Sequence, residues 1–155
     1  MQKLDGQTGF TLIELMVTLA MIVIVLAVGI PAFQSLQQNS NRAARINELV
    51  AAIQLARSEA VKRGTSISII PATNWQNGWT IFTDPDEDRT LDAGETTIRT
   101  AAITSPAYTL TSAAYANGIT FDSEGAPQAT GSFQFSQNSV TRTITINTTG
   151  RPRIL

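Results

Sequence analysis

The chain has 155 residues, with 11 basic and 12 acidic side chains, so its formal net charge of −1 attracts no partner by itself. It contains no cysteine and no histidine, which excludes disulfides, thiolate metal sites, a cysteine nucleophile and the most common general base at neutral pH. The length suits one compact domain with an anchor, and this composition argues against an enzyme.

An apolar segment follows a short polar start of the chain. Residues 10–33 carry a single charged side chain, Glu14, and as a helix they would extend roughly 36 Å, enough to cross a bilayer. A carboxylate is costly in lipid unless a cation pairs with it. Taken alone, the segment would be an uncleaved signal anchor, with Glu14 snorkelling from the helix end. A secretory signal peptide has its cleavage site after the apolar core, whereas here the candidate site after Gly9 precedes it.

The run Gly9-Phe10-Thr11-Leu12-Ile13-Glu14 resembles the class III signal of type IV pilins and type II secretion pseudopilins. The resemblance implies that residues 1–9 are a leader peptide. It also implies that the prepilin peptidase cleaves between Gly9 and Phe10 and that the new Phe10 amine is methylated. Residues 10–33 would then form the transmembrane and assembly helix, and residues 34–155 the head domain.

Glu14 and Pro31 fall at positions that this family uses for filament assembly. Glu14 matches the family's glutamate at the fifth mature position, where its carboxylate can neutralise the Phe10 amine of a neighbouring subunit and fix the packing register. Pro31 removes a helical hydrogen bond, so it bends the helix or lets it melt locally during assembly. The implied partners are other major and minor pilins and the prepilin peptidase. The implied location is the bacterial inner membrane, single pass with a periplasmic head, and then the extracellular pilus.

The chain beyond Pro31 predicts an amphipathic continuation of the helix. Apolar residues recur at three- and four-residue spacing from Ile46 to Ala60. Gly64 directly follows Lys62 and Arg63, and cations followed by glycine are typical of a helix end. We therefore expect one helix from about Phe10 to Arg63.

The remainder of the chain favours short strands, which with one long helix predicts an α+β domain. The resemblance implies the type IV pilin fold, in which the helix packs on antiparallel sheet. The expected strands are Ser66–Ile70, Gly78–Thr83, Thr96–Thr100, Tyr108–Thr111, Ile119–Asp122, Ser132–Phe135 and Arg142–Asn147. The segments Trp75–Asp84 and Asp92–Glu95, followed by Ile98-Arg99, are similar to the head of the GspH/FimT branch of minor pilins and pseudopilins.

The ending Gly150-Arg151-Pro152-Arg153-Ile154-Leu155 is similar to the G-R-x-R tail with which FimT proteins of competent bacteria bind DNA in natural transformation. Arg151 and Arg153 occupy its two basic positions. Gly150 permits a turn and Pro152 favours extended backbone, so the two arginines point the same way, roughly 6–7 Å apart.

Three further basic residues could extend this patch: Arg142, Lys62 and Arg63. The tail has no aromatic side chain, so we expect DNA binding to be weak and independent of sequence. The alternative is a solvated tail, or one that docks on the head through Ile154 and Leu155.

An acidic segment offers oxygen ligands at most positions of a twelve-residue calcium loop, namely Asp84, Asp86, Asp88, Asp92 and Glu95. Arg89 stands where the sharp turn of such a loop requires glycine. We therefore interpret the segment as an acidic hairpin loop, partly neutralised by Arg89 and Arg99, and expect no cofactor; a calcium site at these oxygen ligands is the alternative. The run Asp122-Ser123-Glu124 has no activating base, so we interpret it as a turn and not as a catalytic site.

The sequence therefore predicts a minor pilin, at or near the tip of a type IV pilus, whose head binds extracellular DNA for uptake. Two alternatives stay open. One is a structural priming subunit without a ligand, and the other is a minor pseudopilin of a type II secretion system.

Overall fold

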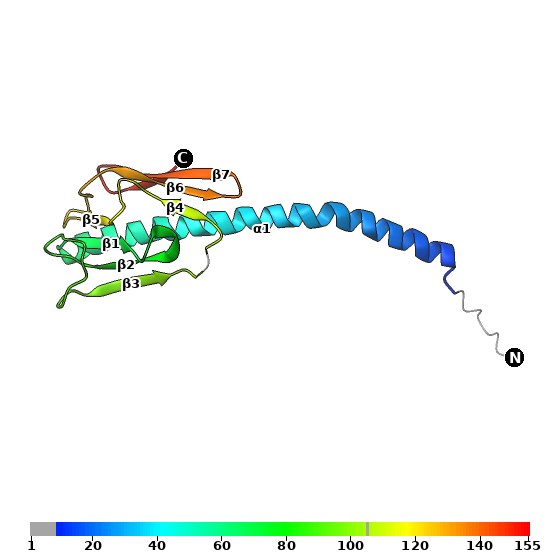
Figure 1. Ribbon diagram of the computed structural model, residues 1–155, viewed down its shortest axis with the longest axis horizontal. Coiled ribbons are helices and arrows are strands. Elements are labelled where there is room, and N and C mark those ends of the chain that lie inside the picture. The colour runs from blue at the N-terminus through cyan, green and yellow to red at the C-terminus, as the bar shows by residue number, and fades with distance from the viewer. Residues whose placement is uncertain (1–8, 105) are drawn as a thin grey trace. The chain divides into compact units, whose positions relative to one another are not determined.

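Helix α1 (Leu12–Arg63), 52 residues long, is the first element of the computed structural model, which describes residues 9–104 and 106–155 (Figure 1). Two compact units divide the chain, Met1–Ala43 and Ala44–Leu155, and each is described by itself. The predicted leader lies outside the described residues apart from Gly9. The predicted helix is confirmed, with its start at Leu12.

Hydrogen bonds close both ends of α1, and the carboxyl-terminal end has the chemistry that the sequence predicts. At the start, Thr11 caps the helix, because its Oγ1 accepts a hydrogen bond from the Glu14 N–H at 3.3 Å. Glu14 lies in the first turn, where a carboxylate interacts favourably with the helix dipole. At the other end, Gly64 adopts a left-handed φ of +63° and donates its N–H to the Ala60 carbonyl at 2.9 Å.

The large apolar side chains of the first unit are exposed from Phe10 to Leu36. Pro31 lies inside the helix. By length and composition alone, α1 is long and apolar enough to cross a membrane.

The second unit contains two four-stranded antiparallel sheets (Figure 1). The first has the order β3 (Thr97–Ala102), β2 (Gly78–Thr83), β1 (Ile67–Pro71) and β5 (Ile119–Phe121). The second has the order β4 (Thr109–Thr111), β6 (Gly131–Gln137), β7 (Val140–Ile146) and β8 (Pro152–Ile154). A short 3₁₀ helix, η1 (Trp75–Asn77), precedes β2.

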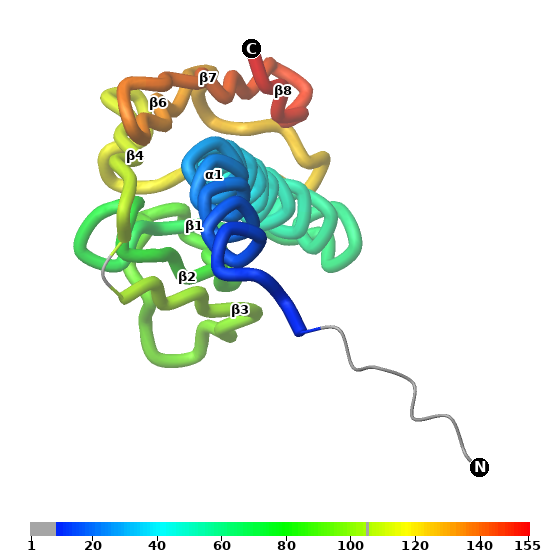
Figure 2. Tube along the Cα trace, turned by 90° about the vertical axis from the view of Figure 1, so that its right-hand side faces the viewer, coloured from blue at the N-terminus to red at the C-terminus, as the bar shows by residue number. Residues whose placement is uncertain are grey.

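One hydrophobic core joins the second half of α1 to both sheets. Figures 1 and 2 show this part of the helix with β1 and β2 on one side and β6 and β7 on the other. Ala52, Ala56 and Ala60 are fully buried, and their small side chains at four-residue spacing let strands approach the helix closely. Trp75 joins the two sheets, since its ring meets Phe133 edge-on at 4.8 Å. Its Nε1–H donates to the Tyr115 carbonyl at 2.7 Å.

The α+β class and the seven expected strands are confirmed, with strand ends within two residues of those predicted. Two features differ from the expectation. The strands form two sheets around the helix where one was expected, and the basic tail is an eighth strand, β8, at the edge of the second sheet.

Candidate nucleic-acid interface

The basic tail begins at a turn that fixes Arg151 through its backbone. Asn147 Oδ1 accepts the Arg151 N–H at 2.8 Å, and the Asn147 carbonyl accepts the Gly150 N–H at 2.9 Å. Gly150 is required for two reasons. Its φ is +73°, and a Cβ there would lie 2.4 Å from the Gly125 carbonyl oxygen. The turn therefore packs directly against the rest of the head.

Strand β8 then pairs with β7 and places both tail arginines on one side. Arg153 lies opposite Thr145 in the ladder, and the Leu155 N–H donates to the Thr143 carbonyl at 2.8 Å. Arg151 and Arg153 are exposed, and both line an open concavity of about 260 Å³. Its other lining residues are Thr145, Asn147 and Leu155. Both arginines therefore face one concavity, as the two-residue spacing predicts, with Arg153 on β8 and Arg151 directly before it.

Arg57, from α1, joins this surface, and the sequence did not single it out. Its Nε–H donates to the carbonyls of Thr149 at 2.9 Å and Gly125 at 3.1 Å. The outer guanidinium nitrogens make no hydrogen bond within residues 9–104 and 106–155. A second open concavity, of about 270 Å³, is lined by Arg57 and Arg151 with Gln54, Gly150 and Pro152.

Arg151 thus lines both concavities and connects Arg57 to Arg153. We call these three residues the basic surface. No acidic side chain lines either concavity, and none of the three arginines belongs to an ion pair within the described chain. The charge of the basic surface is therefore available to an anion.

The structure does not bring the other predicted basic residues to this surface. Lys62 and Arg63 both pair with Glu59 on their own helix, at 3.3 and 2.7 Å. Hydrogen bonds from Arg63 and then Lys62 lower the pKa of the Glu59 carboxyl against the opposing effect of desolvation. Arg142 lies on β7 opposite Phe135, two residues before buried Ile144, so alternation assigns it to the other face of the strand from Thr145.

The acidic loop between β2 and β3 brings together three of its five predicted ligands. The carboxylates of Asp84, Asp86 and Asp88 lie close together, and this group does not include Asp92 or Glu95. Loss of water raises the pKa of the Asp86 carboxyl, and the neighbouring Asp84 and Asp88 carboxylates raise it further.

The remaining predicted sites fall into two groups. The run Asp122-Ser123-Glu124 is a turn, as predicted, because Asp122 Oδ1 accepts the Glu124 and Ala126 N–H groups at 2.9 and 2.8 Å. Gly9 and Phe10, at the predicted cleavage site, are exposed. The assigned roles of Gly9, Phe10, Glu14 and Pro31 stay predictions.

Comparison with known protein families finds two matches along this chain. A model described as type II transport protein GspH matches residues 45–150, and a model of the prokaryotic N-terminal methylation motif matches residues 4–30. The pilin-like protein PilA1 of Thermus thermophilus is 29% identical over 87 residues, which are 56% of this chain and 54% of that protein. The chain thus spans about half the length of this relative.

Comparison with solved structures finds the type IV minor pilin FimU of Pseudomonas aeruginosa in two crystal forms. The first has a TM-score of 0.62 and 23% identity, and covers 77% of this chain and 92% of FimU. The second has a TM-score of 0.59 and 24% identity, and covers 73% and 91%. These proteins share the fold of a long helix packed on antiparallel sheets.

Proposed function

Because this chain belongs to the GspH family, we propose that it is a minor type IV pilin whose head binds DNA without sequence preference through Arg151 and Arg153. The family match covers most of the head, and the methylation motif covers the start of the apolar helix. The likeness to FimU supports the pilin fold of the head. The DNA role rests on the basic surface.

Assembly follows from the amino-terminal residues. The precursor is held in the inner membrane by α1, with its head in the periplasm. The prepilin peptidase cleaves it after Gly9, and the Phe10 amine is methylated. Glu14 then pairs with the amine of a neighbouring pilin as the subunit enters the filament, because a buried carboxylate and a buried amine each offset the desolvation of the other.

The observation that carries the DNA proposal is the continuity of the basic surface. Arg151 lines both concavities, so three guanidinium groups lie along one connected path without an interposed carboxylate. Arginine forks match the geometry of phosphate oxygens. Arg57 is preorganised for such contact, since its Nε is held by two carbonyls while its outer nitrogens stay available.

This chemistry predicts weak binding of the DNA backbone and no base readout. The concavities contain no aromatic side chain on which a base could stack. Contact with two or three phosphates predicts a slope of log affinity against log salt concentration of about −2 to −3 on duplex DNA. Sequence should matter little, because phosphate contacts position DNA without reading it.

The test uses the full chain in a neutral detergent and the fluorescence anisotropy of a short labelled duplex. The wild type should bind at low salt with the slope above, and the double variant Arg151→Ala/Arg153→Ala should bind at least about tenfold more weakly. Arg99→Ala is the matched control, because Arg99 is an exposed arginine on β3 of the other sheet. Equal binding by wild type and double variant would refute the proposal, as would an equal loss in the control.

A second candidate function is that of a minor pseudopilin in type II secretion, and the description of the matched family model favours it. The head of a minor pseudopilin, or that of a pure priming subunit, would contact proteins and not DNA. Absence of DNA binding at low salt, together with normal incorporation into a filament, would favour these alternatives.

A further inference from the structure

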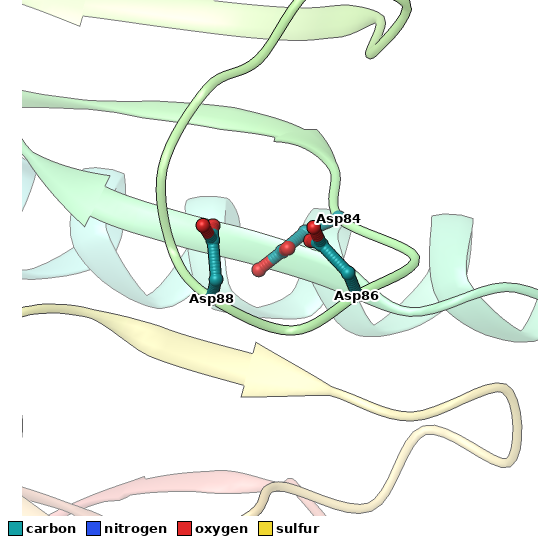
Figure 3. A group of neighbouring side chains, drawn as sticks. All are labelled: Asp84, Asp86 and Asp88. Carbon is teal, nitrogen blue, oxygen red and sulfur yellow. The ribbon is translucent and has the colours of Figure 1, made fainter.

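Three aspartate side chains meet where β2 ends. Asp84 directly follows β2, and Asp86 and Asp88 lie in the loop that leads to β3. One carboxylate oxygen of each lies within 4.8 Å of those of the other two. Figure 3 shows the three side chains directed into the space that the loop encloses. Carboxylates at this separation repel one another unless a proton or a cation lies among them.

Asp84 differs from an ordinary acidic loop residue because it is completely buried, with 0% of its surface exposed. Its Oδ2 accepts hydrogen bonds from the Ser68 hydroxyl and from the Arg89 N–H, the latter at 3.1 Å. Its Oδ1 has no hydrogen-bond donor in the described chain. A buried carboxylate oxygen without a partner is unfavourable, so this atom indicates a ligand beyond the protein's own donors.

No basic side chain of the described residues forms an ion pair with the three carboxylates. The ion pairs within residues 9–104 and 106–155 all lie on α1. The Arg89 side chain turns to neutral partners, since its Nε donates to Thr120 Oγ1 at 3.1 Å and its Nη2 donates to Gln128. Any neutralisation of this loop by Arg89 and Arg99 is therefore partial and does not involve an ion pair within the described residues.

Arg89 also makes the sharp turn for which a calcium loop normally uses glycine. Its φ is +63°, in the left-handed region that such a turn requires. The hydrogen bonds of its side chain to Thr120 and Gln128 help to hold it there. Arg89 therefore adopts the positive φ for which glycine is normally needed, so the missing glycine does not exclude a cation site.

We propose that Asp84, Asp86 and Asp88 bind one calcium ion, which fastens the β2–β3 loop to the end of β2. Asp84 would supply its orphaned Oδ1 from a fixed buried position, and the two exposed aspartates would close over the ion. Asp92 and Glu95 take no part, because their carboxylates lie outside this group, and Glu95 Oε2 instead accepts the Asp92 N–H at 2.9 Å. The site is smaller than the twelve-residue loop that the sequence spacing suggested.

The donor set selects the class of metal. All three ligands are carboxylate oxygens, which suit hard cations, and the chain has no histidine or cysteine to favour zinc or copper. Calcium accepts irregular geometry and completes its shell with water, whereas magnesium demands near-ideal octahedral geometry. With three protein carboxylates, we expect a dissociation constant of about 10⁻⁴ to 10⁻³ M, the range of extracellular calcium modules.

Calorimetric titration of the full chain in a neutral detergent, after treatment with a chelator, tests this site. We expect one calcium ion per chain and markedly weaker binding of magnesium. Calcium at about 10 mM should also raise the melting temperature by about 3–11 °C, because a ligand that binds only the folded state stabilises it. No calcium binding, or magnesium binding of equal strength, would overturn the assignment.

Three variants distinguish calcium binding by the three-carboxylate site from a general effect of the negative charge of the loop. Asp86→Asn and Asp88→Asn should each weaken calcium binding at least about tenfold, since each removes a charged ligand from an exposed side chain and preserves its shape. Asp92→Asn is the matched control, because it removes the same charge from the same loop outside the group. Equal loss in all three variants would overturn the three-carboxylate site, as would unchanged binding in Asp86→Asn and Asp88→Asn. Far-UV circular dichroism would verify that each variant is folded.

Discussion

Replacing Arg57 separates two roles that the structure gives to one side chain. Its Nε–H anchors the tail turn by donating to the carbonyls of Gly125 and Thr149, and its outer nitrogens belong to the basic surface. In Arg57→Gln, the amide nitrogen can occupy the position of Nε, so the donor stays and the charge is removed. In Arg57→Met, a chain of similar length removes both the donor and the charge.

The size of the effect follows from the burial of the two carbonyls. Gly125 is buried, so its carbonyl would lose a hydrogen bond from a charged donor without full access to water, whereas exposed Thr149 can be rehydrated. We estimate that Arg57→Met lowers the free energy of unfolding by about 2 kcal/mol. For a chain of this length, that corresponds to a decrease in melting temperature of about 4–8 °C. Arg57→Gln should retain most of this stability.

Tryptophan fluorescence provides the assay, because both tryptophans, Trp75 and Trp79, are buried in the second unit. DNA anisotropy on the same samples reports the second role. Arg57→Gln should reduce the magnitude of the salt slope by about 0.9, the contribution of one phosphate contact on duplex DNA. An unchanged melting temperature in Arg57→Met would refute the anchor, and an unchanged salt slope in Arg57→Gln would refute the phosphate contact.

Three further predictions concern the turn, the assembly helix and the buried tyrosines. Gly150→Ala should lower the free energy of unfolding by more than about 2 kcal/mol, because it adds a steric overlap to the strain of a positive φ. Gly64→Ala, at a similar φ of +63° but with open space around the Cβ position, should cost less, and equal melting temperatures would contradict this. Glu14→Ala should be cleaved normally by the peptidase but enter filaments poorly, whereas normal incorporation in a pilus preparation would exclude the pairing with a neighbouring amine. Burial raises the pKa of Tyr115 to about 12 and also raises that of Tyr108. The neutral Tyr115 phenol favours the folded state fully below about pH 10, and this stability is lost as the pH rises toward about 12, while Tyr108 acts in the same direction. Phenolate absorbance that appears near pH 10 before unfolding would contradict this.

The fold was largely predictable because its signals are local. The stripe from Ile46 to Ala60, the Gly64 cap and the alternation in strands such as β6 and β7 are each contained within a few neighbouring residues. The division into two sheets was not predictable, since it depends on pairings such as β1 with β5, which are far apart in the chain. Strand β8 was missed because three residues that include a proline show no alternation.

The basic surface was predictable only where the spacing of residues along the chain determines the direction of their side chains. Arg151 and Arg153 line one concavity because extended backbone directs side chains two residues apart to the same side. Arg57 was missed because a polar residue beside the apolar stripe looks like any solvated helix residue, and only the fold brings the Thr149 carbonyl within its reach. The burial of Asp84 was equally hidden, since Ser68, its hydroxyl partner, comes from β1.

The attachment of the tail turn to α1 also determines how the head would carry a mechanical load. A pull on Arg151 would pass to the helix over a short path, through the Arg57 hydrogen bonds beside it and the close contact of Gly150 with Gly125. A pull on Arg153 would instead load the β7–β8 ladder, whose three residue pairs can peel apart one after another. If DNA is drawn in by filament retraction, Arg151 is therefore the stronger attachment point and Arg153 is the first to yield.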